Sequence, residues 1–262
     1  MGSRERWLIA AALSLAAAAR AQPSQECSAA QLAPVDAWLA QHRWRVGPTG
    51  PEARVTSACK ASPVDRRVTI VAAAYDRGTP YEKNLVVALV SGHVESAWTG
   101  AIEEDGSLMI GGDSLHVDTA RYQLAPGVRA FGVDVSSAKA GPHCVDGGSG
   151  ATRTLFVRDG TALRPVLSDV LLQSWHVEGG PAPCPDADRA DKDTGAIAVT
   201  DTTIAIEPHA THGFADIALV STVNLRPRHH DRLVLHYDGA AYAGSGFEPW
   251  RPGIVPDSDP TH

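Results

Sequence analysis

Beyond Cys59 the chain consists of short apolar runs separated by turn residues, and this pattern constrains the fold more than any other feature. The runs are rich in Val, Ile, Leu and Thr, and Gly, Asp and Pro fill the gaps between them. Short runs of this kind without helical periodicity are typical of β-strands. We expect strands at 68–75, 85–90, 93–99, 108–111, 115–119, 128–135, 153–157, 163–167, 170–177, 196–200, 203–206, 215–222, 232–237 and 241–243.

Asp-Gly dipeptides mark several of the turns. They occur at 105–106, 159–160 and 238–239, each between two apolar runs. This dipeptide favours the tight turn of a β-hairpin because both residues accept a positive φ. We predict a hairpin at each position and a fourth at Asp201-Thr202.

A weak internal repeat indicates the fold class. A strand, a polar loop, a second strand with a Gly turn and a third strand recur in three copies at uneven spacing. Repeated meanders favour architectures built from sheets, but uneven spacing argues against a closed propeller. We therefore predict an all-β fold of antiparallel hairpin or meander units, forming a sandwich or an incomplete propeller-like stack.

One helix is predicted before this region. Pro34 suits the first helical position, and Asp36 adds a favourable charge to the first turn. Gly47-Pro48 is expected to end the helix. Its apolar face is expected to pack on the β domain through Val35, Trp38 and Leu39.

The N-terminus has the features of a secretory signal. Two arginines precede an apolar run at 7–19, which is too short to span a bilayer. Ala19 and Ala21 form the small-x-small pattern that signal peptidase recognises. The mature chain is expected to begin near Gln22. The basic residues are 19 Arg and 4 Lys, a bias typical of GC-rich bacterial genomes, so we expect a periplasmic protein.

These features divide the chain into a signal peptide at 1–21, an N-terminal helical segment at 22–60, an antiparallel β domain at 61–247 and a disordered tail at 248–262. The formal charge of −7 becomes −9 when three basic residues and one acidic residue leave with the signal. An acidic chain without a basic run is a poor match for nucleic acid or anionic lipid. No second apolar stretch is long enough to serve as a membrane anchor.

Four cysteines remain in the mature chain. An even number in an oxidising compartment predicts two disulfides. Three pairings are possible, and we favour Cys27–Cys59 and Cys144–Cys184 because each pair lies within one region of the chain. No Cys-x-x-Cys spacing supports a metal or redox site.

Histidines supply the best candidate site. His209, His212 and Asp216 combine imidazole and carboxylate ligands at a spacing that could hold a divalent ion. His229 lies in the next loop and could approach them. The simpler interpretation is a solvated loop at 208–213, so we assign no metal ligands and expect no cofactor. The sequence contains no nucleophile elbow or phosphate-binding loop, and the catalytic residues are unknown.

Two stretches carry a family resemblance: LHVDTARYQLAPGVRAFGV at 115–133 and THGFADIAL at 211–219. Together with Cys59-Lys60 leading into VTIVAAAY, they resemble a group of exported proteobacterial proteins of unknown function. The resemblance covers most of the mature chain. It implies a bacterial periplasmic setting and brings no activity, ligand or catalytic residue.

Two functions follow as hypotheses. The first is a periplasmic, envelope-associated binding module without catalysis, whose partner is another periplasmic protein. The alternative is a cell-envelope hydrolase or metal-dependent enzyme that uses the loop histidines. The oligomeric state does not follow from the sequence.

Overall fold

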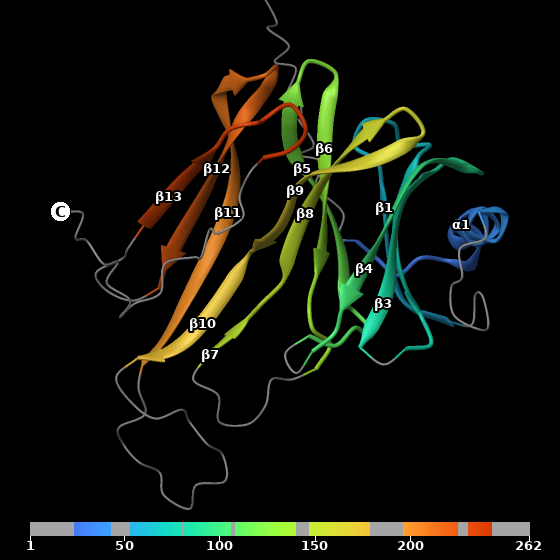
Figure 1. The fold of residues 1–262 in the computed structure, drawn as a ribbon, viewed down its shortest axis with the longest axis horizontal. Coiled ribbons are helices and arrows are strands. Elements are labelled where there is room, and N and C mark those ends of the chain that lie inside the picture. Colours follow the sequence, from blue (N-terminus) through green and yellow to red (C-terminus); the bar gives the residue numbers. More distant parts are fainter. Residues whose placement is uncertain are drawn as a thin grey trace, which may run out of the picture.

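The computed structural model describes residues 24–42, 53–79, 81–105, 108–139, 147–178, 196–224 and 230–242. Within these ranges the chain forms two sheets and one helix, which confirms the predicted all-β class (Figure 1). The elements are α1 (Ala29–Gln41), β1 (Arg54–Ala61), β2 (Thr69–Asp76), β3 (Glu82–Val90), β4 (Val94–Glu103), β5 (Leu115–Ala125), β6 (Val128–Val135), β7 (Gly147–Ser149), β8 (Thr152–Asp159), β9 (Ala162–Leu171), β10 (Gln173–Glu178), β11 (Ala196–Thr211), β12 (Phe214–Val223) and β13 (His230–Leu235).

Several predicted features lie outside the described residues. They are the signal segment 1–21 with Ala19 and Ala21, the tail 248–262, Gly47-Pro48, His229, Cys144 and Cys184. Among the residues that are described, no helix has the length and apolar character needed to cross a membrane.

The larger sheet has eight strands in the order β1-β2-β3-β4-β9-β8-β6-β5. Its neighbours pair antiparallel, except that β4 meets β9 in a short parallel contact at Ala97 and Ala162. The sheet curls until its two outer strands, β1 and β5, contact each other. The ammonium group of Lys60 on β1 donates a hydrogen bond across this contact to the carbonyl of Val117 on β5, at 3.3 Å.

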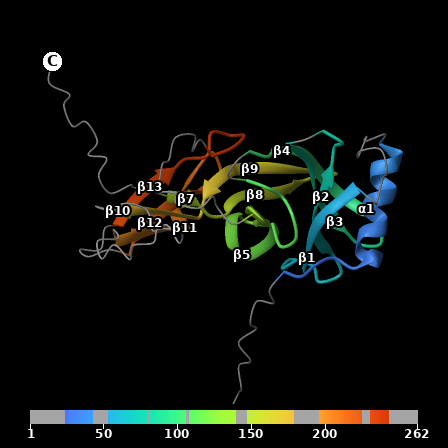
Figure 2. The same ribbon diagram turned by 90° about the horizontal axis from the view of Figure 1, so that it is seen from below.

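Strands β2 and β3 are buried on both faces, which explains their unbroken apolar sequences. Successive side chains of a strand point to opposite faces. Ile70 and Ala72 of β2 therefore face the interior of the curled sheet. Val71 and Tyr75 face outward and pack beneath α1, which covers that side of the sheet (Figure 2).

The second sheet, with strand order β13-β12-β11-β10-β7, covers the half of the outer face that α1 leaves open. Leu155 and Leu167 of the curled sheet pack there against Ile217 and Leu219 of β12. Two chain segments belong to both sheets. β7 continues into β8 past Gly150, and β9 continues into β10 past Leu172, with Gly150 N–H donating to the Gln173 carbonyl at 2.7 Å. This shared pair of strands joins the two sheets.

Helix α1 begins earlier than expected. Ser28 is its N-cap, and a capping box forms between Ser28 and Gln31, so Pro34 lies inside the helix instead of at its first position. The predicted apolar face is confirmed, because Val35 and Leu39 are buried and Trp38 packs beside them. Asp36 accepts a hydrogen bond from the Tyr75 hydroxyl at 3.0 Å.

The strand predictions fail at several places, and β7 is among the strands that were not predicted. Asp201-Thr202 does not turn, because β11 runs straight through it and pairs with β12 on one side and β10 on the other. Segment 108–111 is not a strand. Conversely, β1 was not predicted, although it pairs with β2 along its length. The hairpin at Asp159-Gly160 is confirmed, with Gly160 at φ 61°.

A partly buried ion network links three strands of the curled sheet. Arg153 on β8 forms ion pairs with Asp134 on β6 at 2.6 Å and with Asp118 on β5 at 2.5 Å. The Tyr122 hydroxyl donates to Asp118 at 2.6 Å. Burial raises the pKa of Asp134, but hydrogen bonds from Arg153 and His116 outweigh burial, so the net pKa shift is downward. One guanidinium therefore pairs with two carboxylates at once and offsets part of their negative charge within the sheet.

The predicted disulfide between Cys27 and Cys59 is confirmed, with the two Cα atoms 5.0 Å apart. Backbone hydrogen bonds between Gln25 and Cys59 accompany it. The bridge therefore fixes the segment before α1 to the middle of β1. The second predicted bridge lies outside the described residues.

Removing this bridge should weaken the fold. A cross-link that closes a 32-residue separation stabilises a protein by about 3–4 kcal/mol in the chain-entropy model. We expect the double variant Cys27→Ser, Cys59→Ser to lose about that much free energy of unfolding, measured by urea denaturation without reductant. A loss below about 1 kcal/mol would show that the bridge adds little to α1 docking.

Arg153→Met should be strongly destabilising, because it leaves the buried Asp134 and the partly buried Asp118 without their cation. Removing one partner of a buried ion pair costs about 3–5 kcal/mol, which urea denaturation at pH 7 would detect. Arg67→Met is the matched control, since Arg67 pairs with Asp65 on an exposed surface, where ion pairs contribute little. Equal losses in the two variants would contradict the role given to the network.

Acid should release part of the stability that the network supplies. Because the pKa of Asp134 is lowered on folding, the unfolded chain binds more protons than the native one as pH falls below the ordinary value of about 3.9. The contribution is complete above that pH and is lost as pH falls through the native value. We expect Asp134→Asn to flatten the fall in unfolding free energy below pH 4, measured by urea denaturation across a pH series. An unchanged slope would refute this.

Candidate metal centre

The candidate site begins at a bulge in β11. Ile206 pairs with Ile217 and Ala210 pairs with Ala215, so three residues of β11 lie opposite Asp216 alone. These three are Glu207, Pro208 and His209. Proline cannot donate to a ladder hydrogen bond and is tolerated at bulges for that reason. The bulge places the His209 side chain against the single residue that it faces on β12.

The third strand supplies the second histidine. Leu235 of β13 pairs antiparallel with Ile217 of β12. The next residue, His236, therefore lies beside Asp216, on the side of β12 away from His209. Side-chain alternation directs Ile217 and Leu235 into the core between the sheets and places Asp216 and His236 on the opposite face.

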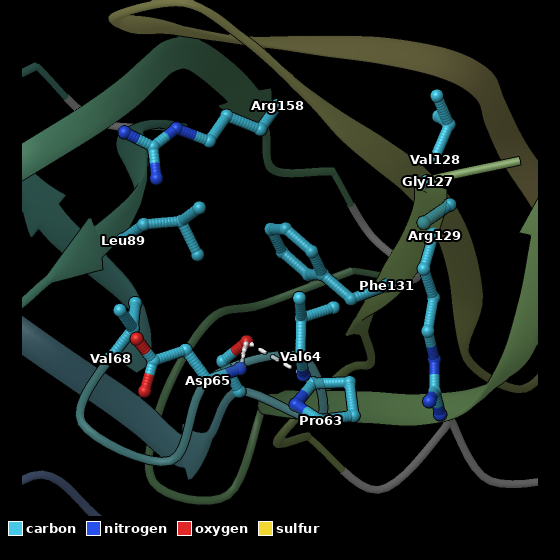
Figure 3. Close-up of a pocket in the computed structure, with 12 residues that line it drawn as sticks. Pro63, Val64, Asp65, Val68, Leu89, Gly127, Val128, Arg129, Phe131 and Arg158 are labelled. Carbon is cyan, nitrogen blue, oxygen red and sulfur yellow. Dashed lines mark hydrogen bonds between the residues drawn. The ribbon is translucent and has the colours of Figure 1, made fainter.

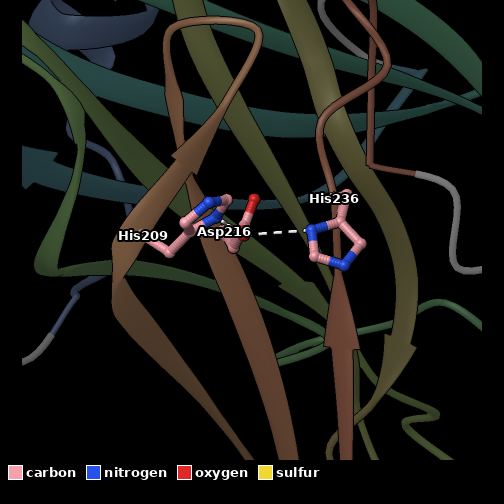
Figure 4. Close-up of side chains that lie close together, drawn as sticks. All are labelled: His209, Asp216 and His236. Carbon is pink, nitrogen blue, oxygen red and sulfur yellow. Dashed lines mark hydrogen bonds and ion pairs between the residues drawn. The ribbon is translucent and has the colours of Figure 1, made fainter.

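The three side chains converge on one carboxylate oxygen (Figure 4). His209 Nδ1 lies 2.6 Å from Asp216 Oδ2, and His236 Nδ1 lies 3.0 Å from the same atom. The ligand atoms of all three residues lie within 4.8 Å of one another. The side chain of Asp216 is 2% exposed, whereas those of His209 and His236 are 74% and 61% exposed. A buried carboxylate thus lies beneath two solvent-facing imidazoles.

The electrostatics of Asp216 favour its charged form. Burial raises its pKa, but hydrogen bonds from His209, Thr211 and His236 more than compensate, so the pKa lies below its ordinary value. Its second oxygen, Oδ1, is buried and has no hydrogen-bond partner among the described residues. A buried carboxylate oxygen without a donor is unfavourable, so this group lacks one positively charged or donating neighbour.

The set of donor atoms fits a divalent transition metal. Imidazole nitrogen and carboxylate oxygen are both ligands of zinc, with bonds of about 2.0–2.2 Å, which places tetrahedral ligand atoms about 3.3 Å apart. The two nitrogen–oxygen distances are slightly shorter than this. Rotation of the exposed imidazoles would open them, and Asp216 Oδ1 would supply a further ligand atom.

The arrangement does not fit a hydroxyl nucleophile activated by histidine. In such a triad the hydroxyl and the carboxylate contact different nitrogens of the imidazole. Here the Thr211 hydroxyl lies 3.3 Å from His236 Nδ1, the same nitrogen that faces Asp216.

The sequence-based set was partly right. The structure brings His209 and Asp216 together but leaves His212 out. His212 and Gly213 have φ values of 49° and 82° and form the two-residue turn between β11 and β12. The expected loop at 208–213 is therefore a bulged strand followed by this turn.

His236 was missed because it lies 20 residues beyond Asp216, inside a predicted strand. Only the pairing of β12 with β13 brings it to the site. An antiparallel pairing of the predicted strands 215–222 and 232–237 in this register would have placed His236 beside Asp216. His230, at the start of β13, pairs with Thr222, which lies six positions beyond Asp216 on β12. It therefore takes no part in the cluster.

Comparison of the chain with protein-family models, with curated proteins and with solved structures found no match. The resemblance to exported proteobacterial proteins stays a prediction, and the site is interpreted from its own chemistry.

Proposed function

We propose that this chain is an exported, non-catalytic binding protein that holds one zinc ion, or a similar divalent transition metal, through His209, Asp216 and His236. The observation that carries the proposal is the convergence of two imidazole nitrogens on one buried carboxylate. The proposal replaces the sequence-based expectation that no cofactor binds.

Burial of the carboxylate supports a metal over a chance surface cluster. Asp216 Oδ1 is buried without a partner among the described residues, and a bound ion is one explanation for such an atom. A divalent cation would satisfy Oδ1 and offset the negative charge that burial otherwise disfavours. It would also join β11, β12 and β13 at one edge of the second sheet.

The ligand atoms that the protein supplies can hold the metal and still admit a donor atom from a partner protein. The two imidazole nitrogens and the two Asp216 oxygens would supply four ligand atoms, so an outside donor would need a five-coordinate ion, a number that zinc reaches in some sites. A partner protein in the periplasm could occupy that fifth position, as the sequence-based hypothesis of a binding module requires. The Cys27–Cys59 bridge supports export, because disulfides persist in oxidising compartments.

Isothermal titration with Zn²⁺ on the purified protein, after treatment with a chelator, tests the proposal. We expect one ion per chain, and a loss of affinity of about 100-fold or more in His236→Ala, since even residues behind the ligands are worth about 10–100-fold. Substitution by Co²⁺ should give visible absorption that His236→Ala lacks.

The control is His212→Ala, which removes an imidazole from the adjacent turn and should leave the affinity unchanged. Asp216→Asn, which keeps the shape but removes the charge, should weaken binding as His236→Ala does. If His212→Ala and His236→Ala bind zinc equally well, or if the unaltered protein binds none, the proposal is wrong.

A further inference from the structure

One end of the curled sheet contains a cavity of about 190 Å³ that the metal centre does not use. It lies where β1, β3 and β8 end and where β2 and β6 begin. Its apolar wall consists of Val68, Leu89 and Phe131, which belong to the buried interior of the sheet (Figure 3). The cavity therefore opens directly into the apolar core.

An apolar side chain at the rim is exposed to solvent. Val64, in the loop between β1 and β2, is 74% exposed and lines the cavity. The loop is held in place, because the Ser62 hydroxyl accepts a hydrogen bond from Val64 N–H at 3.3 Å. The rim therefore offers a fixed apolar surface that the folded chain itself leaves uncovered.

Two of the three charged residues that line the cavity form ion pairs, and the third does not. Asp65 is paired with Arg67 at 2.7 Å, and Arg158 is paired with Glu95 at 2.7 Å. Arg129 is different. In the part of the chain that the structure describes, no carboxylate lies within ion-pair distance of it.

The contacts of Arg129 are carbonyls only. Its Nη2 donates to the carbonyls of Thr119 at 2.9 Å and Ala120 at 3.4 Å, within a bulge of β5. Its Nε is buried and has no hydrogen-bond partner. The guanidinium beside the apolar cavity thus carries a positive charge that no described carboxylate offsets, and such a charge suits a carboxylate ligand.

We propose that this cavity binds a small amphiphilic anion, a short-chain carboxylate whose alkyl chain lies against Val68, Leu89 and Phe131 and whose carboxylate pairs with Arg129. This site is separate from the metal centre and does not depend on it. Small-molecule sites are typically apolar hollows with a few placed polar groups, and this cavity has that composition.

The volume sets the length of the chain. The cavity of about 190 Å³ has the volume of about six water molecules at about 30 Å³ each, which suits a short alkyl chain. Hexanoate is therefore the probe, with its alkyl carbons inside and its carboxylate at the wall that carries Arg129. Each added methylene should raise the affinity about fourfold until the cavity is full.

Isothermal titration of the full chain with propionate, butyrate, pentanoate, hexanoate and octanoate tests this. We expect affinity to rise about fourfold per methylene up to hexanoate and then to level off. Hexanamide, which has the same shape without the charge, should bind about tenfold more weakly or worse. Arg129→Met should lose hexanoate affinity by a similar factor, whereas Arg121→Met, an exposed arginine on the same bulge, should not.

The titrations with unaltered protein keep the test independent of whether Arg129→Met folds. Absence of hexanoate binding at concentrations on the order of 10 mM would overturn the proposal. Equal affinity for hexanamide and hexanoate would also overturn it. Both results are unaffected by zinc, so failure here and failure of the metal centre are distinguishable.

Discussion

The structure depends on burying both faces of the eight-stranded sheet. A sheet with continuous apolar runs at 70–75 in β2 and 85–90 in β3 cannot leave either face in water. Curling encloses one face, and α1 and the second sheet cover the two halves of the other (Figures 1 and 2). The Cys27–Cys59 bridge ties α1 to its half, and the strands shared by both sheets tie the second sheet to the other half.

Bulges place the polar chemistry on this apolar frame. In β5, residues 119–121 lie opposite Phe131 alone, and Arg129 contacts the freed carbonyls. In β11, residues 207–209 lie opposite Asp216 alone, and His209 contacts its carboxylate. A bulge interrupts the ladder and redirects side chains. Both candidate sites therefore sit where regular pairing fails.

The two sites suit different ligands for physical reasons. The metal centre combines a buried negative charge with solvent-facing imidazoles, so it favours a small cation that reaches it from water. The cavity combines an apolar wall with an uncompensated guanidinium, so it favours an anion with an apolar chain. They lie on different sheets, and nothing in the geometry requires them to be occupied together.

Local sequence signals determined most of the strands, the turn at Asp159-Gly160 and the disulfide near α1. Apolar runs predicted the sheets, Asp159-Gly160 predicted its hairpin, and the pair Cys27 and Cys59 was predicted from proximity along the chain. The capping box at Ser28 and Gln31 is also a local signal, and it begins the helix before Pro34. These features depend on residues close in sequence, which is why the sequence alone carries them.

Tertiary structure decided everything that depends on register. Asp201-Thr202 has the composition of a turn, yet pairing on both sides keeps β11 extended. His212 looked like a ligand by its spacing, but the turn holds it away from the cluster. His236 looked like a strand residue, yet β13 pairs beside Asp216 and brings it to the site. A one-residue shift in register would reverse which side chains meet, and no short-range pattern in the chain fixes that register.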